Sequence, residues 1–241
     1  MRSGVVGVAR TESTQRFFRD WYWDLANNIY WSPHGVSMLL EQEGIPFETI
    51  SDRDLEDEDA LKQFSVIVLA DQPFLTEKQK ETVHAVHRRG TGIIVDGMTG
   101  WIDPSESDFR GMEMGLRPLP QLADLQGLTR VDYDFSYGTY RLRVTRREHM
   151  ITHMLESPEE RSFPIKYLPI MEVKGLVPKT EVLAKFLGSK KRTGFPALMA
   201  YDDGFGRVVT FAFPAARWAI FKSNAPLHPE KDLDIVNYPI D

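Results

Sequence analysis

The residues best suited to chemistry lie in one sharp turn, DGMTG at 96–100, which follows an apolar run ending at Val95. Many α/β enzymes hold a nucleophile at such a turn. Here Met98 stands near the elbow, and a thioether has no proton to lose and forms no acyl intermediate. Thr99 could attack in its place, but it would need an adjacent base, and nothing in the sequence nominates one strongly. We therefore expect this turn to have the position of an active site without a catalytic nucleophile.

Two pairs of histidines have helical spacing that could bring imidazoles together: His84 with His87, and His149 with His153. A metal also needs a third ligand, and neither pair has the internal glutamate of an HExxH arrangement. The acidic stretch 51–60 lacks the central glycine and the distal glutamate of an EF-hand loop. We expect surface or interface histidines and a solvated acidic face, with no metal and no cofactor.

The composition is that of an ordinary globular protein, with 42% hydrophobic and 27% charged residues. A formal net charge of −6 argues against a nucleic-acid partner, which would require a surplus of Lys and Arg. The chain has no cysteine, which excludes disulfides, thiolate metal sites and a cysteine nucleophile. No apolar segment is long enough to indicate a signal peptide or a membrane anchor. We expect a cytoplasmic protein with no membrane partner.

The elements that must position the turn alternate along the chain. Continuous apolar runs favour strands that are buried on both faces, as in parallel sheets. Strands are predicted at 4–9, 45–50, 65–71 and 90–97, with helical patterns at 14–43, broken at Ser32 and Pro33, at 52–64, and at 77–89 with Thr76 as its cap. This order predicts an α/β fold with a three-layer, doubly wound, mostly parallel sheet. Ligands of such sheets bind beyond the carboxyl ends of the strands, where the turn at 96–100 lies.

The C-terminal half mixes helical and hairpin patterns. Residues 118–128 predict a short helix, and 130–145 alternate like an antiparallel hairpin around Tyr137-Gly138. A further helix is expected to begin at 148–156. Residues 195–213 predict two antiparallel strands joined by a turn at Asp202-Asp203-Gly204. We expect residues 1–241 to form a single domain.

Several stretches resemble the class I glutamine amidotransferase-like superfamily. The residues that carry the resemblance run from HGVSMLLEQEGIPFETISDRDLED (34–57) through FSVIVLADQPFLTEKQKETVHAVHRRGTGIIVDGMTGWID (64–103). EHMITHMLE (148–156) is similar to the D-H-P-I-T-x-G-L segment of these proteins, and FPALMAYDDGFGRVVTFAF (195–213) to their P-A-L…G-R-V-V-Y-x-A ending. The nearest likeness is to the trimerisation domain of β-galactosidases and to trehalose-utilisation-type proteins.

The resemblance covers about 34–130 and 147–213, and leaves the aromatic-rich residues 14–33 as a helical insertion. Amidotransferases of this superfamily attack glutamine with a cysteine at the elbow, helped by a histidine and a glutamate. Met98 in that region implies the fold without glutaminase activity. The LHPE at 227–230 copies their His-Pro-Glu signature but comes about fourteen residues late, so we interpret it as a tail loop.

The resemblance implies a non-catalytic domain that binds a partner subunit, such as a glycoside hydrolase, or a carbohydrate-related ligand, and that supports a homo-oligomer. The candidate ligand-binding residues at the rim of the sheet are Asp96, Met98, Thr99, Trp101, Asp103 and His149. Aromatic side chains suit subunit contacts, sugar stacking or core packing, and the candidate interface residues are Trp21, Tyr22, Trp23 and Trp31. The alternative is a hydrolase acting on a sugar or an amide through an Asp/His site at the same rim.

Overall fold

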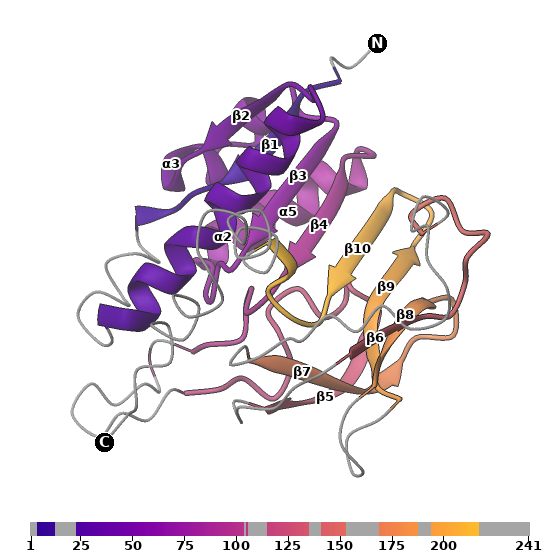
Figure 1. The fold of residues 1–241 in the computed structure, drawn as a ribbon. Helices are drawn as coiled ribbons and strands as arrows, with labels where there is room; N and C mark the ends of the chain where they lie inside the picture. The colour runs from indigo at the N-terminus through magenta and orange to yellow at the C-terminus, as the bar shows by residue number, and fades with distance from the viewer. Residues whose placement is uncertain are drawn as a thin grey trace, which may run out of the picture.

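The main element of the fold is an eight-stranded mixed sheet (Figure 1). The computed structural model describes residues 4–12, 23–103, 105, 115–134, 141–152, 169–187 and 194–216. The strands of this sheet are β1 (Val6–Ala9), β2 (Phe47–Ile50), β3 (Val66–Ala70), β4 (Gly92–Asp96), β6 (Arg141–Val144), β8 (Glu181–Leu187), β9 (Pro196–Asp202) and β10 (Arg207–Phe211). Their order is β2-β1-β3-β4-β10-β9-β8-β6. The expected α/β class with a largely parallel sheet is confirmed.

The first five strands in this order are parallel, and the remaining three join them in antiparallel fashion. The central strands β1, β3 and β4 are largely apolar and buried, as expected of parallel strands covered on both faces. At Gly7 of β1 there is no room for a side chain, since a Cβ would lie 2.3 Å from Cδ1 of Ile50. The chain leaves β1 for β2 on one side and then returns past β1 to β3, so the strand order reverses between β1 and β3.

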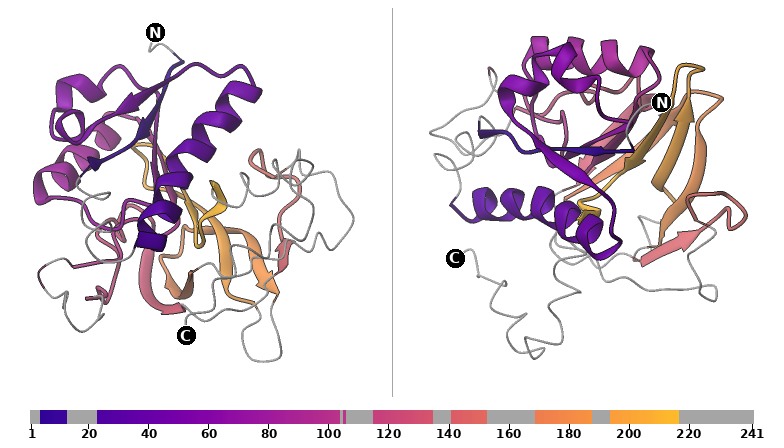
Figure 2. Two further views of the ribbon diagram at one scale, coloured as in Figure 1. Left: turned by 60° about the vertical axis from the view of Figure 1, so that its left-hand side comes forward. Right: turned by 90° about the horizontal axis from the view of Figure 1, so that it is seen from above.

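The helices are α2 (Trp23–Gln42), α3 (Asp52–Leu55), α4 (Glu58–Leu61) and α5 (Glu77–Arg88). In the view from above, α5 and α2 lie on opposite sides of the parallel strands (Figure 2). Helix α5 begins with the expected capping box, in which Thr76 and Gln79 exchange hydrogen bonds between side chain and backbone. In the acidic stretch, the side chains of Ser51 and Asp57 cap the N-termini of the short helices α3 and α4 by accepting hydrogen bonds from backbone amides.

The helix break expected at Ser32 and Pro33 is wrong, because α2 continues through both residues. A proline inside a helix removes one backbone hydrogen bond and costs about 3 kcal/mol. Both residues are buried, and the Ser32 hydroxyl donates a hydrogen bond to Asp71 at the end of β3. These tertiary contacts offset the local cost.

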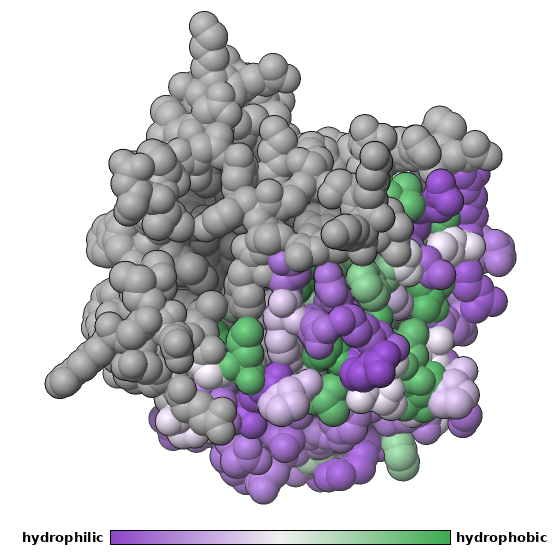
Figure 3. Space-filling view, turned by 90° about the horizontal axis from the view of Figure 1, so that it is seen from below, coloured by the Kyte–Doolittle hydropathy of each residue, from purple (hydrophilic) through white to green (hydrophobic). Residues whose placement is uncertain are grey.

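The hairpin expected over 130–145 is also wrong. Strand β5 (Leu128–Asp134) pairs with β7 (Ile170–Leu176) in a separate two-stranded sheet, whereas β6 pairs with β8 in the main sheet. The inward side chains of β5 and β7, Val131 and Val173 among them, pack with Met199 of β9 in one core cluster. The outward side is polar: Lys174 pairs with Asp132, and the described surface seen from below is mostly hydrophilic (Figure 3).

Two expected helices appear as turns in the described residues. Residues 121–127 form successive turns in place of the helix expected at 118–128, and residues 147–152 form turns where a helix was expected to begin. The final hairpin is confirmed: β9 and β10 are antiparallel and are joined by a turn in which Gly204 has φ +94°. Among the described residues, no helix is long and apolar enough to cross a membrane.

Candidate functional site

The carboxyl ends of β1, β3 and β4 meet at one edge of the parallel sheet, next to the point where the strand order reverses. Asp71, which directly follows β3, is fully buried and has φ +47°; among the described residues it is the one non-glycine with positive φ. Aspartate tolerates this left-handed conformation better than most residues. The conformation turns the chain sharply out of β3 and toward the turn after β4.

The Asp71 carboxylate joins α2 to the turn at 96–100. Its Oδ2 accepts a hydrogen bond from the Ser32 hydroxyl, and its Oδ1 accepts one from the Met98 amide at 2.8 Å. A Cβ at Gly97 would lie 2.1 Å from that same Oδ1. The glycine therefore allows the carboxylate to approach the backbone of the turn.

The Gln72 side chain ties the ends of β1 and β3 together. Its Oε1 accepts a hydrogen bond from the Thr11 hydroxyl at 2.5 Å, and its Nε2 donates to the carbonyls of Ala70 at 2.9 Å and Ala9 at 3.3 Å. Gln72 and Thr11 are both buried. These hydrogen bonds hold the carboxyl ends of β1 and β3 together.

The Thr99 side chain also forms hydrogen bonds with backbone groups. Its Oγ1 accepts a hydrogen bond from the Gln72 amide at 3.1 Å and lies 2.9 Å from the carbonyl oxygens of Leu69 and Asp96, to which it can donate. A carbonyl oxygen is too weak a base to take the hydroxyl proton at neutral pH, so this contact does not activate a nucleophile. The hydroxyl is buried and fixes the turn against β3.

The Asp96 carboxylate holds the chain that follows β10. Its two oxygens accept hydrogen bonds from the amides of Ala215 at 2.8 Å and Ala216 at 3.1 Å, where the chain turns helical. A carboxylate at the start of a helical turn satisfies amides that lack partners within the turn. Asp96 is 2% exposed, so this contact joins two segments more than a hundred residues apart in the interior.

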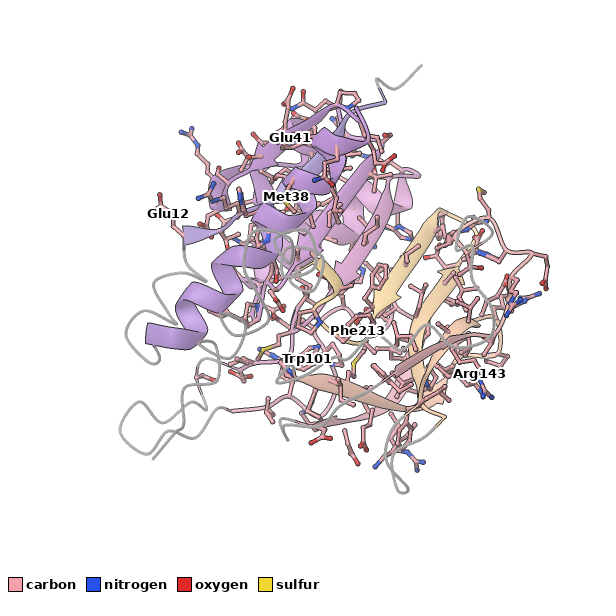
Figure 4. The ribbon with its side chains drawn as sticks, in the orientation of Figure 1. Glu12, Met38, Glu41, Trp101, Arg143 and Phe213 are labelled. Carbon is pink, nitrogen blue, oxygen red and sulfur yellow. The ribbon has the colours of Figure 1, made fainter. Side chains whose placement is uncertain are left out.

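Met98 and Trp101 belong to the core between the main sheet and the β5–β7 sheet. Both are fully buried, and the Trp101 ring lies 4.8 Å from the Tyr133 ring at an interplanar angle of 41°. Burial raises the pKa of Tyr133, and nearby Arg117 opposes the rise only in part. Figure 4 shows Trp101 just beyond the end of the parallel strands, in the same region as Phe213.

Asp103, three residues after the turn, is a candidate rim residue that reaches solvent. It accepts hydrogen bonds from the Ser105 amide and hydroxyl, at 3.0 and 2.6 Å, and pairs with Arg117 at 3.0 Å. The hydrogen bonds from Ser105 lower the pKa of Asp103, and the charge of Arg117 adds to the effect. The side chain is 22% exposed.

The structure brings Asp96, Met98, Thr99, Trp101 and Asp103 together but places His149 elsewhere. His149 lies in the turn after β6, and β10, β9 and β8 stand between β4 and β6. Its Nδ1 accepts a hydrogen bond from the Ile151 amide at 3.2 Å.

The aromatic candidates, His153 and the residues of the LHPE segment are described only in part or not at all. Trp21, Tyr22, His153, His228 and Glu230 lie outside the described residues; Trp23 and Trp31 lie in α2, where the structure describes the backbone alone.

His84 and His87 lie in different surroundings. His87, expected at a surface or an interface, is fully buried: its Nε2 lies 3.1 Å from both Asp203 oxygens, and its Nδ1 lies 3.1 Å from the Thr91 carbonyl. Burial lowers the pKa of half-buried His84, against the influence of Asp124 at 3.6 Å. Among the described residues, no group of three His, Cys, Asp or Glu side chains could hold a metal ion.

Four residues that build this rim were not among the candidate site residues: Thr11, Ser32, Asp71 and Gln72. A signal for two of them was present, because Asp71 and Gln72 are polar residues directly after a fully apolar strand. Ser32 was taken for a helix break, and its role depends on a partner 39 residues away.

Comparison with known proteins shows similarity in fold alone. No family model matches the chain, and no curated protein matches it. The β-galactosidase of Bacillus circulans is similar in structure, with a TM-score of 0.58 and 14% identity over 94% of this chain and 31% of that one. A ThuA-like protein from Bacteroides uniformis has a TM-score of 0.55 and 13% identity over 97% of this chain and 88% of that one. A cytoplasmic protein from Salmonella typhimurium has a TM-score of 0.50 and 11% identity over 92% and 97%. This chain therefore spans about a third of the β-galactosidase and nearly all of the other two proteins.

Proposed function

We propose that this chain is a non-catalytic amidotransferase-like domain that binds a partner subunit or a carbohydrate-related ligand and supports assembly of a homo-oligomer. The observation that carries the proposal is the burial and hydrogen bonding of the two side chains in the turn after β4, Met98 and Thr99. A fully buried methionine thioether occupies the region where related enzymes carry their cysteine, and the neighbouring Thr99 hydroxyl bonds to backbone groups. The proposal is that this turn corresponds to the amidotransferase elbow and lacks an ionisable nucleophile.

The carbohydrate connection is supported by structural likeness to β-galactosidases and to a ThuA-like protein. Since this chain matches 31% of the β-galactosidase of Bacillus circulans, we propose that it corresponds to an accessory domain of such enzymes. A glycoside hydrolase is then a natural partner. We further propose a single, doubly wound three-layer domain, which the placement of α2 and α5 on opposite sides of the parallel strands supports, and a cytoplasmic location.

Different residues would serve the two kinds of contact. Asp103 and its neighbour Arg117 reach the surface at the rim and would meet a ligand or a partner first, while Asp96, Met98, Thr99 and Trp101 would shape the rim from within. Trp21, Tyr22, Trp23 and Trp31 would contribute a subunit interface. His149 would act separately, because three strands lie between its own strand and β4.

The same separation weighs against the alternative function. A hydrolase with an Asp/His site would need Asp96 and His149 within hydrogen-bond reach of one substrate. Neighbouring strands lie about 4.8 Å apart, so the four steps from β4 to β6 span roughly 19 Å. The Asp96 carboxylate is moreover occupied by two backbone amides.

The proposal is tested by measuring molar mass and turnover on the same purified full-length chain. Light scattering coupled to size exclusion should give a multiple of 27.7 kDa, and ammonia release from glutamine and hydrolysis of glycoside and amide panels should stay at background. Trp31→Ala should lower the mass. A monomer that hydrolyses a substrate, with the activity lost in both Asp96→Asn and His149→Ala, would establish the alternative function instead.

A further inference from the structure

Two polar side chains, Gln126 and Thr210, lie in the apolar interior. Each is 1% exposed. Within the described part of the chain, neither polar atom of the Gln126 side-chain amide has a hydrogen-bond partner, and neither does the Thr210 hydroxyl. A buried amide or hydroxyl has lost its bonds to bulk water, and this loss is costly unless another group replaces them. Both side chains therefore need a partner that the described residues do not supply.

Gln126 lies on the side of its turn that faces the sheet. Its backbone amide donates a hydrogen bond to the Leu122 carbonyl at 3.0 Å, so the backbone here has the spacing of a helical turn. At this spacing, residue 126 lies between 122 and 123 when the turn is viewed along its axis. Leu122 belongs to the core cluster that includes Val83 of α5, and Ala123 to the core cluster that includes Val131 of β5. The Gln126 side chain therefore enters the interior between these two clusters.

Thr210 lies at the boundary between the same two clusters. It is part of β10, which runs between β4 and β9 in the sheet (Figure 1). Thr210 is opposite Val95 of β4, which belongs to the cluster with Val83, and opposite Met199 of β9, which belongs to the cluster with Val131. The hydroxyl is thus a polar group in the strip of sheet where the two clusters meet.

The residue after Gln126 fixes the turn over this part of β10. A Cβ at Gly127 would lie 2.9 Å from Cγ of Tyr201, so the backbone of the turn packs directly on the Tyr201 ring. Tyr201 is opposite Val208, which comes two residues before Thr210 and is on the same face of the strand. These contacts bring Gln126 to the stretch of β10 that carries Thr210.

Water matches the hydrogen-bonding capacity of both groups. The Gln126 amide has two N–H donors and an acceptor oxygen, and the Thr210 hydroxyl can donate and accept. A buried water typically forms about three hydrogen bonds to groups that would otherwise be unsatisfied. An ion does not suit the site, because neither side chain has a charge that would offset the cost of burying one.

We propose that an internal water molecule bridges the Gln126 amide and the Thr210 hydroxyl and holds the turn at 121–127 against β10. The same turn supports the candidate site, since the backbone amide of Gln121 donates a hydrogen bond to the Gly100 carbonyl at 2.9 Å. The inference goes beyond the proposed function, because the bridge requires neither an oligomer nor a ligand.

The direct test is a crystal structure of the full chain at a resolution that shows ordered water. We expect one water within about 3 Å of both the Gln126 amide and the Thr210 hydroxyl. A direct hydrogen bond between the two side chains, or a structure with no water between them, overturns the proposal.

A double-mutant cycle tests the bridge in solution. Gln126→Met and Thr210→Val keep the approximate shapes of the side chains and remove their polar groups, and urea unfolding followed by circular dichroism gives the midpoints. Each single variant should have a lower midpoint than the wild type, because the other group loses part of its network, and the double variant should lose clearly less than the sum of the two losses. Two groups without a bridge behave differently: each single change raises the midpoint, and the two gains add. That result overturns the proposal, and so do two losses that simply add.

Gln121→Met is the matched control on the same turn. The Gln121 side chain accepts a hydrogen bond from the Leu75 amide at 2.6 Å and donates one to the Leu75 carbonyl at 2.7 Å. Its removal should lower the midpoint, and its combination with Thr210→Val should give the sum of the two separate changes. Coupling as strong as that between Gln126→Met and Thr210→Val would show a general loosening of the turn, and would count against the bridge.

Discussion

The imidazole of His87, at the end of α5, is held between a carboxylate and a carbonyl that come from opposite sides. Its Nε2 lies 3.1 Å from both oxygens of Asp203, in the turn between β9 and β10, and its Nδ1 lies 3.1 Å from the Thr91 carbonyl. The Thr91 carbonyl and the Asp203 carboxylate both accept hydrogen bonds, so an imidazole N–H that faces either of them donates the bond. Gly206 packs on the ring, where a Cβ would lie 3.1 Å from the imidazole Cε1. This contact ties the last hairpin to the parallel half of the sheet.

His87→Ala should therefore destabilise the fold strongly. The variant removes a fully buried ring and leaves the Asp203 carboxylate without the hydrogen-bond partner on α5, and losing such a partner costs about 1–3 kcal/mol before the lost packing of the ring is added. Urea unfolding followed by circular dichroism measures the effect. His84→Ala is the matched control, because His84 is on the same helix but only approaches Asp124 at 3.6 Å, and should cost less than about 1 kcal/mol. Equal losses in the two variants would contradict the role of the His87 contact.

Asp203 gives this contact a dependence on pH. Burial would raise the pKa of Asp203, but hydrogen bonds from the Phe205 amide and from His87 outweigh burial and lower the pKa overall. A carboxyl with a lowered pKa stabilises the fold above its unfolded pKa, about 3.9, and loses this contribution as the pH falls toward the folded value. The urea midpoint of the wild type should therefore fall more steeply below about pH 4 than that of Asp203→Asn. If the two pH curves stayed parallel, Asp203 would not be the group responsible.

Local signals predicted much of the parallel half of the fold. The apolar run of β3 and the Thr76–Gln79 capping box of α5 depend on a few neighbouring residues, and both were predicted correctly. Strand partners were harder to predict, because pairing is decided by contacts far away in the sequence. The alternation in 130–145 indicated strands but could not show that β5 and β6 belong to different sheets.

In the candidate site, too, local features were predictable and contacts between distant residues were not. The turn at 96–100 and its place beyond β4 were predictable from an apolar strand that ends in glycines. The partners of its side chains were not, because Asp71 bonds to Ser32 in a different helix and Asp96 to Ala215 in the last described segment. The sequence also could not show that Met98 and Trp101 would be fully buried, since the β5–β7 sheet that covers them had not been predicted.

Gly97→Ala tests how closely the turn fits the Asp71 carboxylate. Gly97 has φ +63°, and an added Cβ would lie 2.1 Å from Oδ1 of Asp71. Gly44→Ala is a matched control, since Gly44 has φ +65° but no atom within 4 Å of an added Cβ. The backbone strain alone costs about 1 kcal/mol, so Gly44→Ala should lose about that much and Gly97→Ala at least about 3 kcal/mol, or fail to fold. Similar unfolding midpoints for the two variants would show that the carboxylate moves aside at little cost.

Substitutions of Thr99 test whether its hydroxyl has a structural or a catalytic role. Thr99→Val keeps the shape of the side chain but leaves the buried Gln72 amide and the Leu69 carbonyl without the hydroxyl, at a cost of about 1–3 kcal/mol. Thr99→Ser keeps the hydroxyl and should lie within about 1 kcal/mol of the wild type, because it loses one methyl group. Thermal and urea unfolding of the two variants measure the difference. A Thr99→Val protein as stable as the wild type would contradict the hydrogen-bonding role, since a hydroxyl that only formed a bond with substrate could be removed without loss of stability.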